Sequence, residues 1–222
     1  MLKTPYQDTP ELRQAIIDSC KEMNSRGINQ GTSGNISARA GDRMIITPSG
    51  VPYDRMTPEM LASTPLDGDS AFEGPLPPST EWQFHLALLR AKPDMHAVVH
   101  AHPVHCTALA INRMEIPSCH YMIALFGGDT VPLAGYALFG SDELAREVTD
   151  VMKDRQGCLM ANHGAVVVGE TLEKGLWRLE ELEVLAKAYI LSRTIGSPHI
   201  LSKSEIDAVL GAVKNYGMKT EV

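Results

Sequence analysis

The sequence predicts an α/β fold in which helices pack around a sheet. The apolar run at residues 97–99 is typical of a buried strand. Apolar residues also recur at helical spacing through residues 171–196, which predicts a long helix. A chain of 222 residues with 44% hydrophobic side chains can build one full core, so we expect a single domain over residues 1–222.

Six helices are expected from cap residues and apolar periodicity. The first covers residues 9–27, with Thr9 as its N-cap, Glu11 in its first turn and Gly27 at its end. The longest covers residues 171–196, and its apolar face is formed by Leu172, Leu176, Leu179, Leu182, Ala186 and Ile190. The other helices are expected at residues 79–92, 104–111, 141–154 and from residue 204 onward.

Strands are expected between these helices, where short apolar segments end in glycine or proline turns. They cover residues 35–39, 43–47, 97–102 and 131–133, and two more lie within residues 158–168, on either side of His163-Gly164. Residues 63–79 contain four prolines and two glycines, so we expect a loop with one short hairpin there.

Composition excludes several classes of function. The net charge is −7, and the chain has no basic stripe of the kind that binds nucleic acid. No apolar run approaches the ~20 residues of a membrane helix, and residues 1–10 do not resemble a signal peptide. The cysteines are scattered, as in reduced cytosolic proteins. We therefore expect a cytoplasmic protein without nucleic-acid or membrane partners.

The pair His100-Ala101-His102 follows the apolar run of the central strand. Side chains at i and i+2 of a strand point to the same face, so two imidazoles can bind one divalent metal there, and zinc suits histidine nitrogen. Pro103 cannot donate a ladder hydrogen bond, which places the pair at the rim of the sheet. The alternative is two polar residues on a hydrated strand face.

A second motif, Ser79-Thr80-Glu81-Trp82, opens the helix expected at residues 79–92. Thr80 with Gln83 fits a capping box, and Glu81 would then merely favour the positive end of the helix. The hydroxyl groups and free amides of a helix N-terminus also form an anion site. Both interpretations stay open from these residues alone.

Three turns complete the set of motifs. Asn162-His163-Gly164 is either a tight turn with a surface histidine or the source of a third metal-binding nitrogen. Gly31-Thr32-Ser33-Gly34-Asn35 and Thr47-Pro48-Ser49-Gly50 either reverse the chain or present amides and hydroxyls to a phosphate. Neither is a Walker loop, because no Gly-Lys-Ser/Thr follows.

The order of these motifs, together with His120-Tyr121, resembles the class II aldolase/adducin family. The resemblance extends from Glu11 to Tyr216, and it is most specific at residues 29–32, 98–100, 104–107 and 120–124. Within the family, the chain is most similar to the branch of aldolases that cleave a ketose 1-phosphate. The resemblance implies a three-layer α/β/α domain with a largely antiparallel sheet, which is the class II aldolase fold.

The resemblance also implies roles for individual residues. One Zn²⁺ per subunit, with Mn²⁺ or Co²⁺ as alternatives, would be bound by Glu81, His100, His102 and His163. Glu81 would leave the metal on substrate binding and act as the catalytic base, and Tyr121 from a neighbouring subunit would handle the proton on the aldehyde side. Substrate would be bound by Gly34, Asn35, Ser49, Gly50, Ser79, Thr80, Phe139 and Tyr216. The family implies a homotetramer with four-fold symmetry and active sites at subunit interfaces.

The implied reaction is the reversible cleavage of a ketose 1-phosphate to dihydroxyacetone phosphate and an aldehyde. Candidate substrates are 5-methylthioribulose 1-phosphate, 5-deoxyribulose 1-phosphate and L-fuculose 1-phosphate. The chain departs from the fuculose branch at Leu125-Phe126 and at Val213. We therefore expect a rebuilt aldehyde pocket in which Phe126, Phe139 and Val213 favour an apolar substituent.

Two other functions are compatible with parts of this pattern. An L-ribulose-5-phosphate 4-epimerase shares the fold and the retro-aldol step, but epimerases of the family carry an aspartate where this chain has Glu81. A non-catalytic interaction domain like the head of adducin need not keep the metal ligands, whereas this chain has three histidines and the glutamate. The aldolase is the stronger hypothesis.

The remaining polar residues are expected to have ordinary structural roles. His85 is expected to line the core, and His96 and His105 to lie in turns or at the surface. The charged residues of the long helix are expected on a solvated face: Arg178, Glu180, Glu181, Glu183 and Lys187.

Overall fold

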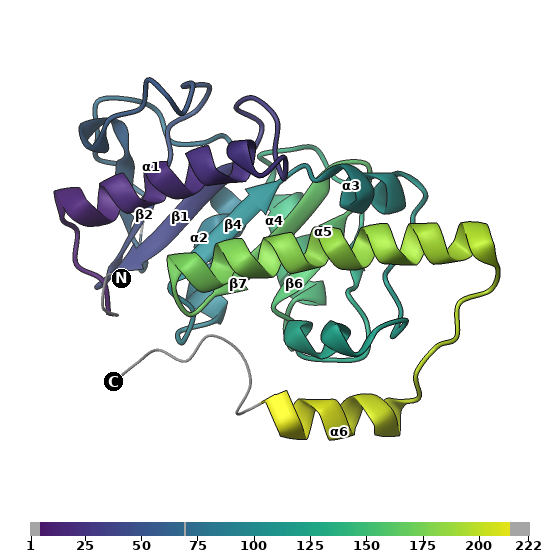
Figure 1. Ribbon diagram of the computed structural model, residues 1–222. Helices are drawn as coiled ribbons and strands as arrows, with labels where there is room; N and C mark the ends of the chain where they lie inside the picture. Colours follow the sequence, from purple (N-terminus) through teal and green to yellow (C-terminus); the bar gives the residue numbers. More distant parts are fainter. Residues whose placement is uncertain (1–4, 69, 214–222) are drawn as a thin grey trace.

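The computed structural model describes residues 5–68 and 70–213, in which one seven-stranded sheet lies between two layers of helices (Figure 1). The strand order is β3-β2-β1-β4-β7-β6-β5. Neighbouring strands pair antiparallel, except that β5 and β6 are parallel. The α/β fold with a largely antiparallel sheet is therefore confirmed.

Strands and helices are interspersed along the described chain. The strands are β1 (Asn35–Ala40), β2 (Arg43–Ile46), β3 (Ala62–Pro65), β4 (Ala97–Ala101), β5 (Leu133–Ala134), β6 (Gly157–Met160) and β7 (Gly164–Gly169). The helices are α1 (Pro10–Ser25), α2 (Trp82–Ala91), α3 (Val104–Ile111), α4 (Asp142–Val151), α5 (Leu172–Ile195) and α6 (Lys203–Val213), with short 3-10 segments η1 (Pro58–Met60) and η2 (Tyr121–Phe126).

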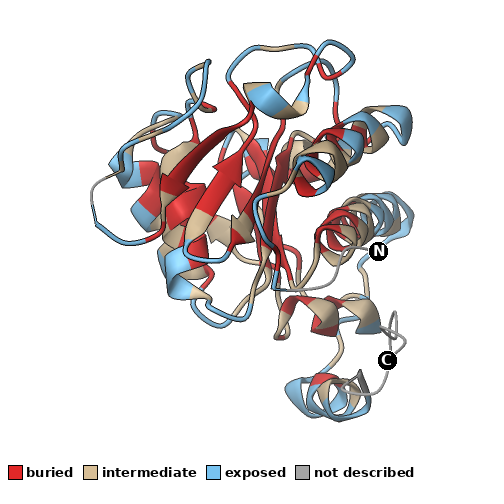
Figure 2. Ribbon diagram, turned by 90° about the vertical axis from the view of Figure 1, so that its left-hand side faces the viewer, coloured by how far each residue is buried: buried red, intermediate tan, exposed pale blue. Residues whose placement is uncertain are grey.

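The two faces of the sheet form separate cores. Helices α1, α3 and α5 cover one face, and α2 and α4 cover the other. Figure 2 shows the buried strands between these layers. Side chains alternate along β4, so Val99 enters the first core and Val98 the second. His100 therefore points to the face that α2 covers, where its ring contacts Phe84 edge-on at 5.4 Å between centroids.

Several helices begin where the capping residues predict. The side-chain oxygens of Thr9, Ser141 and Thr171 accept hydrogen bonds from the backbone amides of Leu12, Leu144 and Lys174. Each of these bonds satisfies one of the free amides at a helix start, which favours that boundary over its neighbours.

The predicted start of the second helix is wrong. Helix α2 begins at Trp82, and the preceding Glu81 makes no side-chain capping bond. The capping box does not form either, because the side-chain oxygen of Gln83 accepts no hydrogen bond from the described residues, and its amide nitrogen donates to the backbone oxygen of Gly140 at 2.7 Å. Ser79 instead accepts from the backbone amide of Glu81 at 3.3 Å, and the side chain of Glu81 is thereby left for the interior.

Four further predictions are corrected or refined. Residues 131–133 were expected as a strand, but β5 is Leu133–Ala134, and Val131 forms an isolated bridge with Ile116. The hairpin expected within residues 63–79 is confirmed as a bridge between Ser63 and Glu73. Phe126 is fully buried in the core, so it does not belong to an aldehyde pocket. Arg178 is 6% exposed rather than solvated.

No helix within the described ranges is both long and apolar enough to cross a membrane.

Candidate active site and metal centre

The site forms where the end of β4 meets the start of β1, the start of β7 and the segment before α2. The register pairs His100 with Asn35 on one side and with Val166 on the other. His102 lies one residue beyond β4, and His163 lies in the turn between β6 and β7. The sheet thus gathers the motifs recognised separately along the chain.

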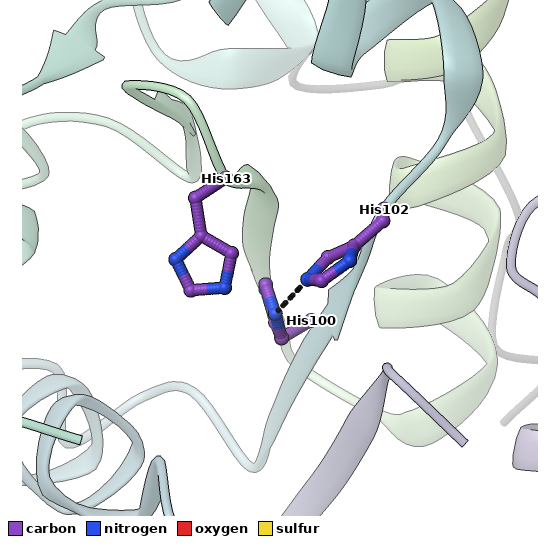
Figure 3. A group of neighbouring side chains, drawn as sticks. All are labelled: His100, His102 and His163. Carbon is purple, nitrogen blue, oxygen red and sulfur yellow. Dashed lines mark hydrogen bonds between the residues drawn. The ribbon is translucent and has the colours of Figure 1, made fainter. Parts of the chain in front are cut away.

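Three histidines converge at this point (Figure 3). His100, His102 and His163 each offer a ring nitrogen, and these atoms all lie within 4.8 Å of one another. The Nε2 atoms of His100 and His102 are 3.2 Å apart. His100 is fully buried, and its Nδ1–H donates to the backbone oxygen of Ala165 at 2.9 Å. This bond leaves Nε2 of His100 with a free lone pair that faces the other ligands.

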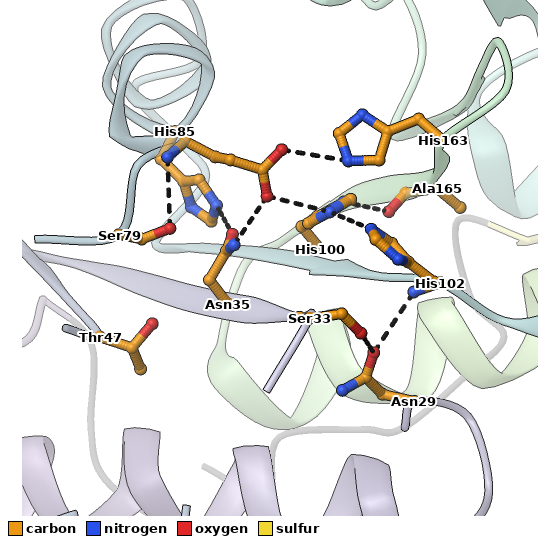
Figure 4. Close-up of polar contacts among 12 residues, drawn as sticks. Asn29, Ser33, Asn35, Thr47, Ser79, His85, His100, His102, His163 and Ala165 are labelled. Atoms are coloured by element: carbon orange, nitrogen blue, oxygen red, sulfur yellow. Dashed lines mark hydrogen bonds and ion pairs between the residues drawn. The ribbon is translucent and has the colours of Figure 1, made fainter. Parts of the chain in front are cut away.

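Glu81 completes the cluster, and Figure 4 shows how its partners Asn35, His100 and His163 converge. Its Oε2 lies 3.2 Å from Nε2 of His100, and its Oε1 lies 3.1 Å from Nε2 of His163. Glu81 is 5% exposed, and the side-chain amide of Asn35 donates to its Oε2 at 2.9 Å. The other oxygen, Oε1, is buried and accepts no hydrogen bond from the described residues. One carboxylate oxygen is therefore held, while the other is free for a further ligand.

The donor set fits a divalent metal ion such as zinc. Atoms bound about 2.0–2.1 Å from a tetrahedral ion lie roughly 3.3 Å from one another. Three contacts link these four residues: Glu81 lies 3.1 Å from His163 and 3.2 Å from His100, and His100 lies 3.2 Å from His102. The bare Nε2 of His100 also faces a carboxylate oxygen, and two acceptors at this distance repel unless a positive charge lies between them. This arrangement favours a cation at the centre.

The electrostatics of the cluster act on its own ionisable groups. Burial alone would raise the pKa of Glu81, but the two neighbouring imidazoles of His100 and His163, at 3.2 and 3.1 Å, outweigh it and hold that pKa well below its usual range. Burial, reinforced by His100 and His163, lowers the pKa of His102 to about 4. At neutral pH the cluster thus offers a carboxylate and, at His102, a neutral imidazole, which are the forms that bind metal.

Two glycines permit the close approach of these segments. A Cβ atom at Gly34 would lie 2.7 Å from the backbone oxygen of His100. A Cβ atom at Gly164 would lie 2.5 Å from the oxygen of Ala101 and 2.7 Å from the ring of His102. Asn162, before His163, has a φ of 55°, a left-handed conformation that asparagine tolerates better than most residues. The turn that carries His163 is therefore built by its two neighbours.

A pocket of about 450 Å³ opens next to the metal ligands. It brings together ten of the residues expected at the site: Gly34, Asn35, Ser49, Gly50, Ser79, Thr80, Glu81, His102, Phe139 and His163. His100 does not line the pocket, because it is fully buried behind the other ligands. Tyr121 is 47% exposed on η2 and does not line the pocket of its own chain. Tyr216 lies outside the described residues, as does the side chain of Val213.

Sequence reasoning missed several residues that support the site. Asn29 accepts from Ser33 at 3.1 Å and from the backbone amide of His102 at 3.4 Å, so it ties the first glycine turn to a metal ligand. Tyr136 and Asn162 line the pocket. Glu183 binds the start of α3 directly after His102-Pro103. Asn29 and Asn162 belong to the motifs noted in the sequence, whereas nothing local marks Glu183.

Comparison with known proteins agrees with this geometry. The family described as Class II Aldolase and Adducin N-terminal domain matches residues 14–190. The chain is 44% identical over 212 residues to L-fuculose phosphate aldolase of Escherichia coli (strain K12), a match that covers 95% of this chain and 98% of that protein. It is also 44% identical over 212 residues to a 5-methylthioribulose-1-phosphate/5-deoxyribulose-1-phosphate aldolase of Escherichia coli O45:K1, with 94% and 98% covered.

A solved structure described as L-fuculose 1-phosphate aldolase superposes with a TM-score of 0.89 and 32% identity, covering 93% of this chain and 97% of that one. The chain belongs to the class II aldolase/adducin family. Because these relatives are named as aldolases, the expectation of an enzyme of the lyase class, rather than a non-catalytic domain, is confirmed.

Proposed function

We propose that the chain is a metal-dependent class II aldolase that reversibly cleaves a ketose 1-phosphate to dihydroxyacetone phosphate and an aldehyde. The observation that carries this proposal is the buried carboxylate of Glu81, whose two oxygens face His100 and His163 beside an open polar pocket. A base held among metal ligands suits a reaction that moves a proton at a carbon next to a carbonyl group. The aldolases similar to this chain support the same reaction.

The metal would be one Zn²⁺ per subunit, with Mn²⁺ or Co²⁺ as alternatives. His100, His102 and His163 would hold it, together with Glu81 before substrate binds. When bound, the ion supplies positive charge that stabilises the negative charge developing on the substrate oxygens. Uncharged imidazole ligands leave that charge intact, and the histidine cluster of the described chain contains no cysteine thiolate that would reduce it.

The protons move through two side chains in this proposal. In the direction of condensation, the carboxylate of Glu81 accepts a proton from C3 of dihydroxyacetone phosphate, and C3 then forms a bond to the aldehyde carbon. The hydroxyl group of Tyr121 from a neighbouring subunit donates a proton to the aldehyde oxygen, which becomes the C4 hydroxyl group. Cleavage reverses each transfer, and exchange with solvent restores both groups between turnovers.

The phosphate group would be bound by neutral donors. Gly34, Asn35, Ser49, Gly50, Ser79 and Thr80 line one side of the pocket. None of the lining residues in the described chain is a lysine or arginine, so backbone amides, hydroxyl groups and the N-terminal end of α2 must supply the attraction. Such a site can bind a phosphate group locally, although the net charge of −7 gives the protein no general attraction for anions.

The aldehyde end of the substrate would be apolar. Tyr136 and Phe139 line the pocket and are 59% and 60% exposed, so their rings are available to an apolar substituent. This favours 5-methylthioribulose 1-phosphate or 5-deoxyribulose 1-phosphate over L-fuculose 1-phosphate. Clear preference for L-fuculose 1-phosphate in a side-by-side comparison of kcat/KM would contradict this choice.

The active site would be shared between subunits of a homotetramer with four-fold symmetry. Tyr121 is exposed and is not among the residues that line the pocket of its own chain, so its side chain is available to a second copy. Tyr216 would close over the bound substrate. The tetramer would act in the cytoplasm.

The decisive experiment is a cleavage assay with the three ketose 1-phosphates, in which released dihydroxyacetone phosphate is coupled to an NADH-dependent reductase. We expect release that a chelator abolishes and Zn²⁺ restores. Glu81→Gln should lower kcat by about 10²–10⁴-fold, because a positioned general base contributes that much. Glu181→Gln, a change of the same kind on α5, is the control. Metal-loaded protein that releases no product from any of the three would contradict the proposal.

The shared site has its own test. In the proposed tetramer, each active site takes Glu81 from one subunit and Tyr121 from its neighbour. A Tyr121→Phe subunit beside a Glu81→Gln subunit therefore forms one site in which both residues are intact. We expect two inactive preparations to regain activity when they are unfolded and refolded together. Absence of any recovery, with mixed tetramers demonstrated by mass, would place Tyr121 outside its neighbour's site.

A further inference from the structure

His85 is a buried polar residue that the proposed reaction does not use. It lies on α2, one helical turn after Glu81, and it is fully buried. Its ring stacks on Phe84 with 4.7 Å between centroids. Both of its nitrogens have polar partners. Nδ1 lies 2.8 Å from the hydroxyl group of Ser37. Nε2 lies 2.5 Å from Oδ1 of Asn35, a contact that Figure 4 shows. Because both ring nitrogens have polar partners, His85 can orient those partners as well as pack in the core.

The direction of each hydrogen bond follows from the groups involved. The carboxylate of Glu81 can only accept, so the Asn35 atom that faces it is the amide nitrogen, Nδ2. The oxygen of the same amide then faces His85, whose Nε2 must carry a proton to donate to it. In a neutral ring the proton on Nε2 leaves Nδ1 as an acceptor, and Ser37 donates to it.

The ring of His85 is neutral under ordinary conditions. Burial is the main cause that lowers the pKa of His85 to about 3. The neutral ring can carry its proton on either nitrogen, but only one tautomer satisfies Ser37, Asn35 and Glu81 together. The opposite tautomer would turn the amide of Asn35 and place its oxygen against the carboxylate of Glu81, where two acceptors repel.

We propose that His85 is a positioning residue that fixes the amide of Asn35, and through it the carboxylate of Glu81, by means of its Nε2–H tautomer. The chain of bonds runs from the hydroxyl group of Ser37 through His85 and Asn35 to Oε2 of Glu81. This inference rests on the proposed role of Glu81 as the base. Asn35 also lines the pocket, so the same bond orients a group that faces substrate.

Four variants test the inference. His85→Leu removes the donor and keeps an apolar side chain in the core. His85→Gln keeps an N–H that can reach Asn35. Ser37→Ala removes the far end of the chain of bonds. His96→Leu is the matched control, because it makes the same change at a histidine that does not line the pocket. The ring of His96 contacts the ring of Tyr6 edge-on, with 6.0 Å between their centroids.

The readouts separate positioning from general loss of structure. The rate at which solvent hydrogen exchanges into C3 of dihydroxyacetone phosphate, without aldehyde, reports the base alone. We expect His85→Leu to slow this exchange about 100-fold, the cost of a base displaced by roughly 1 Å, with KM and bound metal changed by less than about threefold. His85→Gln should recover most of the rate, and Ser37→Ala should lose less than His85→Leu.

The tautomer can be measured in the wild-type protein without any variant or assay. Long-range nitrogen-15 NMR spectra of histidine-labelled protein distinguish Nδ1–H from Nε2–H rings. We expect Nε2–H at His85 and the opposite form at His100, whose Nδ1–H is bound to Ala165. An Nδ1–H ring at His85, or equal rates in His85→Leu and wild type, would overturn the inference.

The two proposals fail in different ways. If wild type cleaves no ketose 1-phosphate and exchanges no hydrogen at C3, the proposed function fails, whatever tautomer His85 has. If wild type is active and His85→Leu and His85→Gln lose activity equally, the donor has no special role and only the inference about His85 fails.

Discussion

Glu81 is a charged residue that the interior accepts because of its neighbours. A carboxylate that is 5% exposed loses most of its water, which is costly unless donors or cations replace it. Asn35 supplies one donor, and His100 and His163 face the two oxygens. These partners come from β1, β4 and the turn before β7. The carboxylate therefore depends on residues distant from it in the sequence.

At Gly164, one added methyl group should damage the histidine cluster. Gly164→Ala places a Cβ atom 2.7 Å from the ring of His102, so the ring or β7 must move. We expect metal affinity to fall at least about tenfold and the free energy of unfolding to fall by about 1–3 kcal/mol, as for other overpacked sites. Gly211→Ala adds the same methyl group on α6, where nothing lies within 4 Å, and should leave both quantities unchanged or slightly improved. Metal titration and urea unfolding measure them, and unchanged affinity in Gly164→Ala would contradict the expectation.

His85 should also make stability depend on pH. Its pKa is about 3 in the folded protein and about 6.5 in an unfolded chain, so the unfolded chain binds one more proton between these values. The contribution of the neutral His85 ring to the free energy of unfolding is fully present above pH 6.5 and is lost progressively as the pH falls below that value. Between pH 7 and 5 the metal-free wild type should lose about 2 kcal/mol more than His85→Gln. His102, whose pKa is about 4 in the folded protein, makes the same contribution in wild type and in His85→Gln, so the difference between the two proteins reports His85. The free energy of unfolding of each protein is measured by urea unfolding at several pH values. If it changes with pH by the same amount in wild type and in His85→Gln, the prediction is contradicted.

Helix α3 shows how one element is anchored by another. Glu183 of α5 accepts from the backbone amides of His105 and Cys106 at 3.0 Å and from the ring of His105 at 2.6 Å. These are free amides at the start of α3, which directly follows His102-Pro103. Glu183 was expected on a solvated helix face, but it acts as a cap supplied from another helix. Arg178 was also expected on the solvated face of this helix, but it pairs with Glu170 and donates to the backbone oxygen of Val168.

Removal of this cap should destabilise the protein. Glu183→Ala leaves two amides at the start of α3 without their acceptor, and loss of a helix cap costs about 0.5–2 kcal/mol. Glu183→Gln keeps an oxygen acceptor and should cost less. Glu181→Ala, on the same helix, is the control, because Glu181 forms no hydrogen bond or ion pair among the described residues. Chemical unfolding measures each change, and equal stability of Glu183→Ala and Glu181→Ala would contradict the cap.

Across the whole molecule, the proposed metal joins parts of the chain that the sheet brings together. His100 lies in the central strand β4 and His102 one residue beyond it, while His163 precedes the neighbouring strand β7 and residue 81 precedes α2. An ion bound only by the folded protein stabilises it by an amount that grows with the logarithm of the ratio of its free concentration to Kd. The metal should therefore act on global unfolding and not on one loop.

Zinc should raise the melting temperature of the metal-free protein. A free concentration 100 times Kd adds about 2.7 kcal/mol, which corresponds to roughly 5–10 °C for a domain of this size. His163→Ala should lose most of this shift, whereas His199→Ala, at an exposed position, should keep it. Differential scanning calorimetry with and without a chelator measures both, and an equal shift in His163→Ala would remove His163 from the site.

Local signals in the sequence predict the helix caps, the apolar stripe of α5, most of the strands next to the short turns and the histidine pair after β4. These features depend on neighbours within a few residues, so their residue types are sufficient. The start of α2, the burial of Phe126 and Arg178, the cap from Glu183 and the bonds of His85 depend on segments far apart in the chain. They follow from strand order and packing, which no local pattern contains. The family resemblance implies that Glu81 joins the histidines, whereas the tertiary structure supplies the contacts between them and alone orders the polar groups behind Glu81.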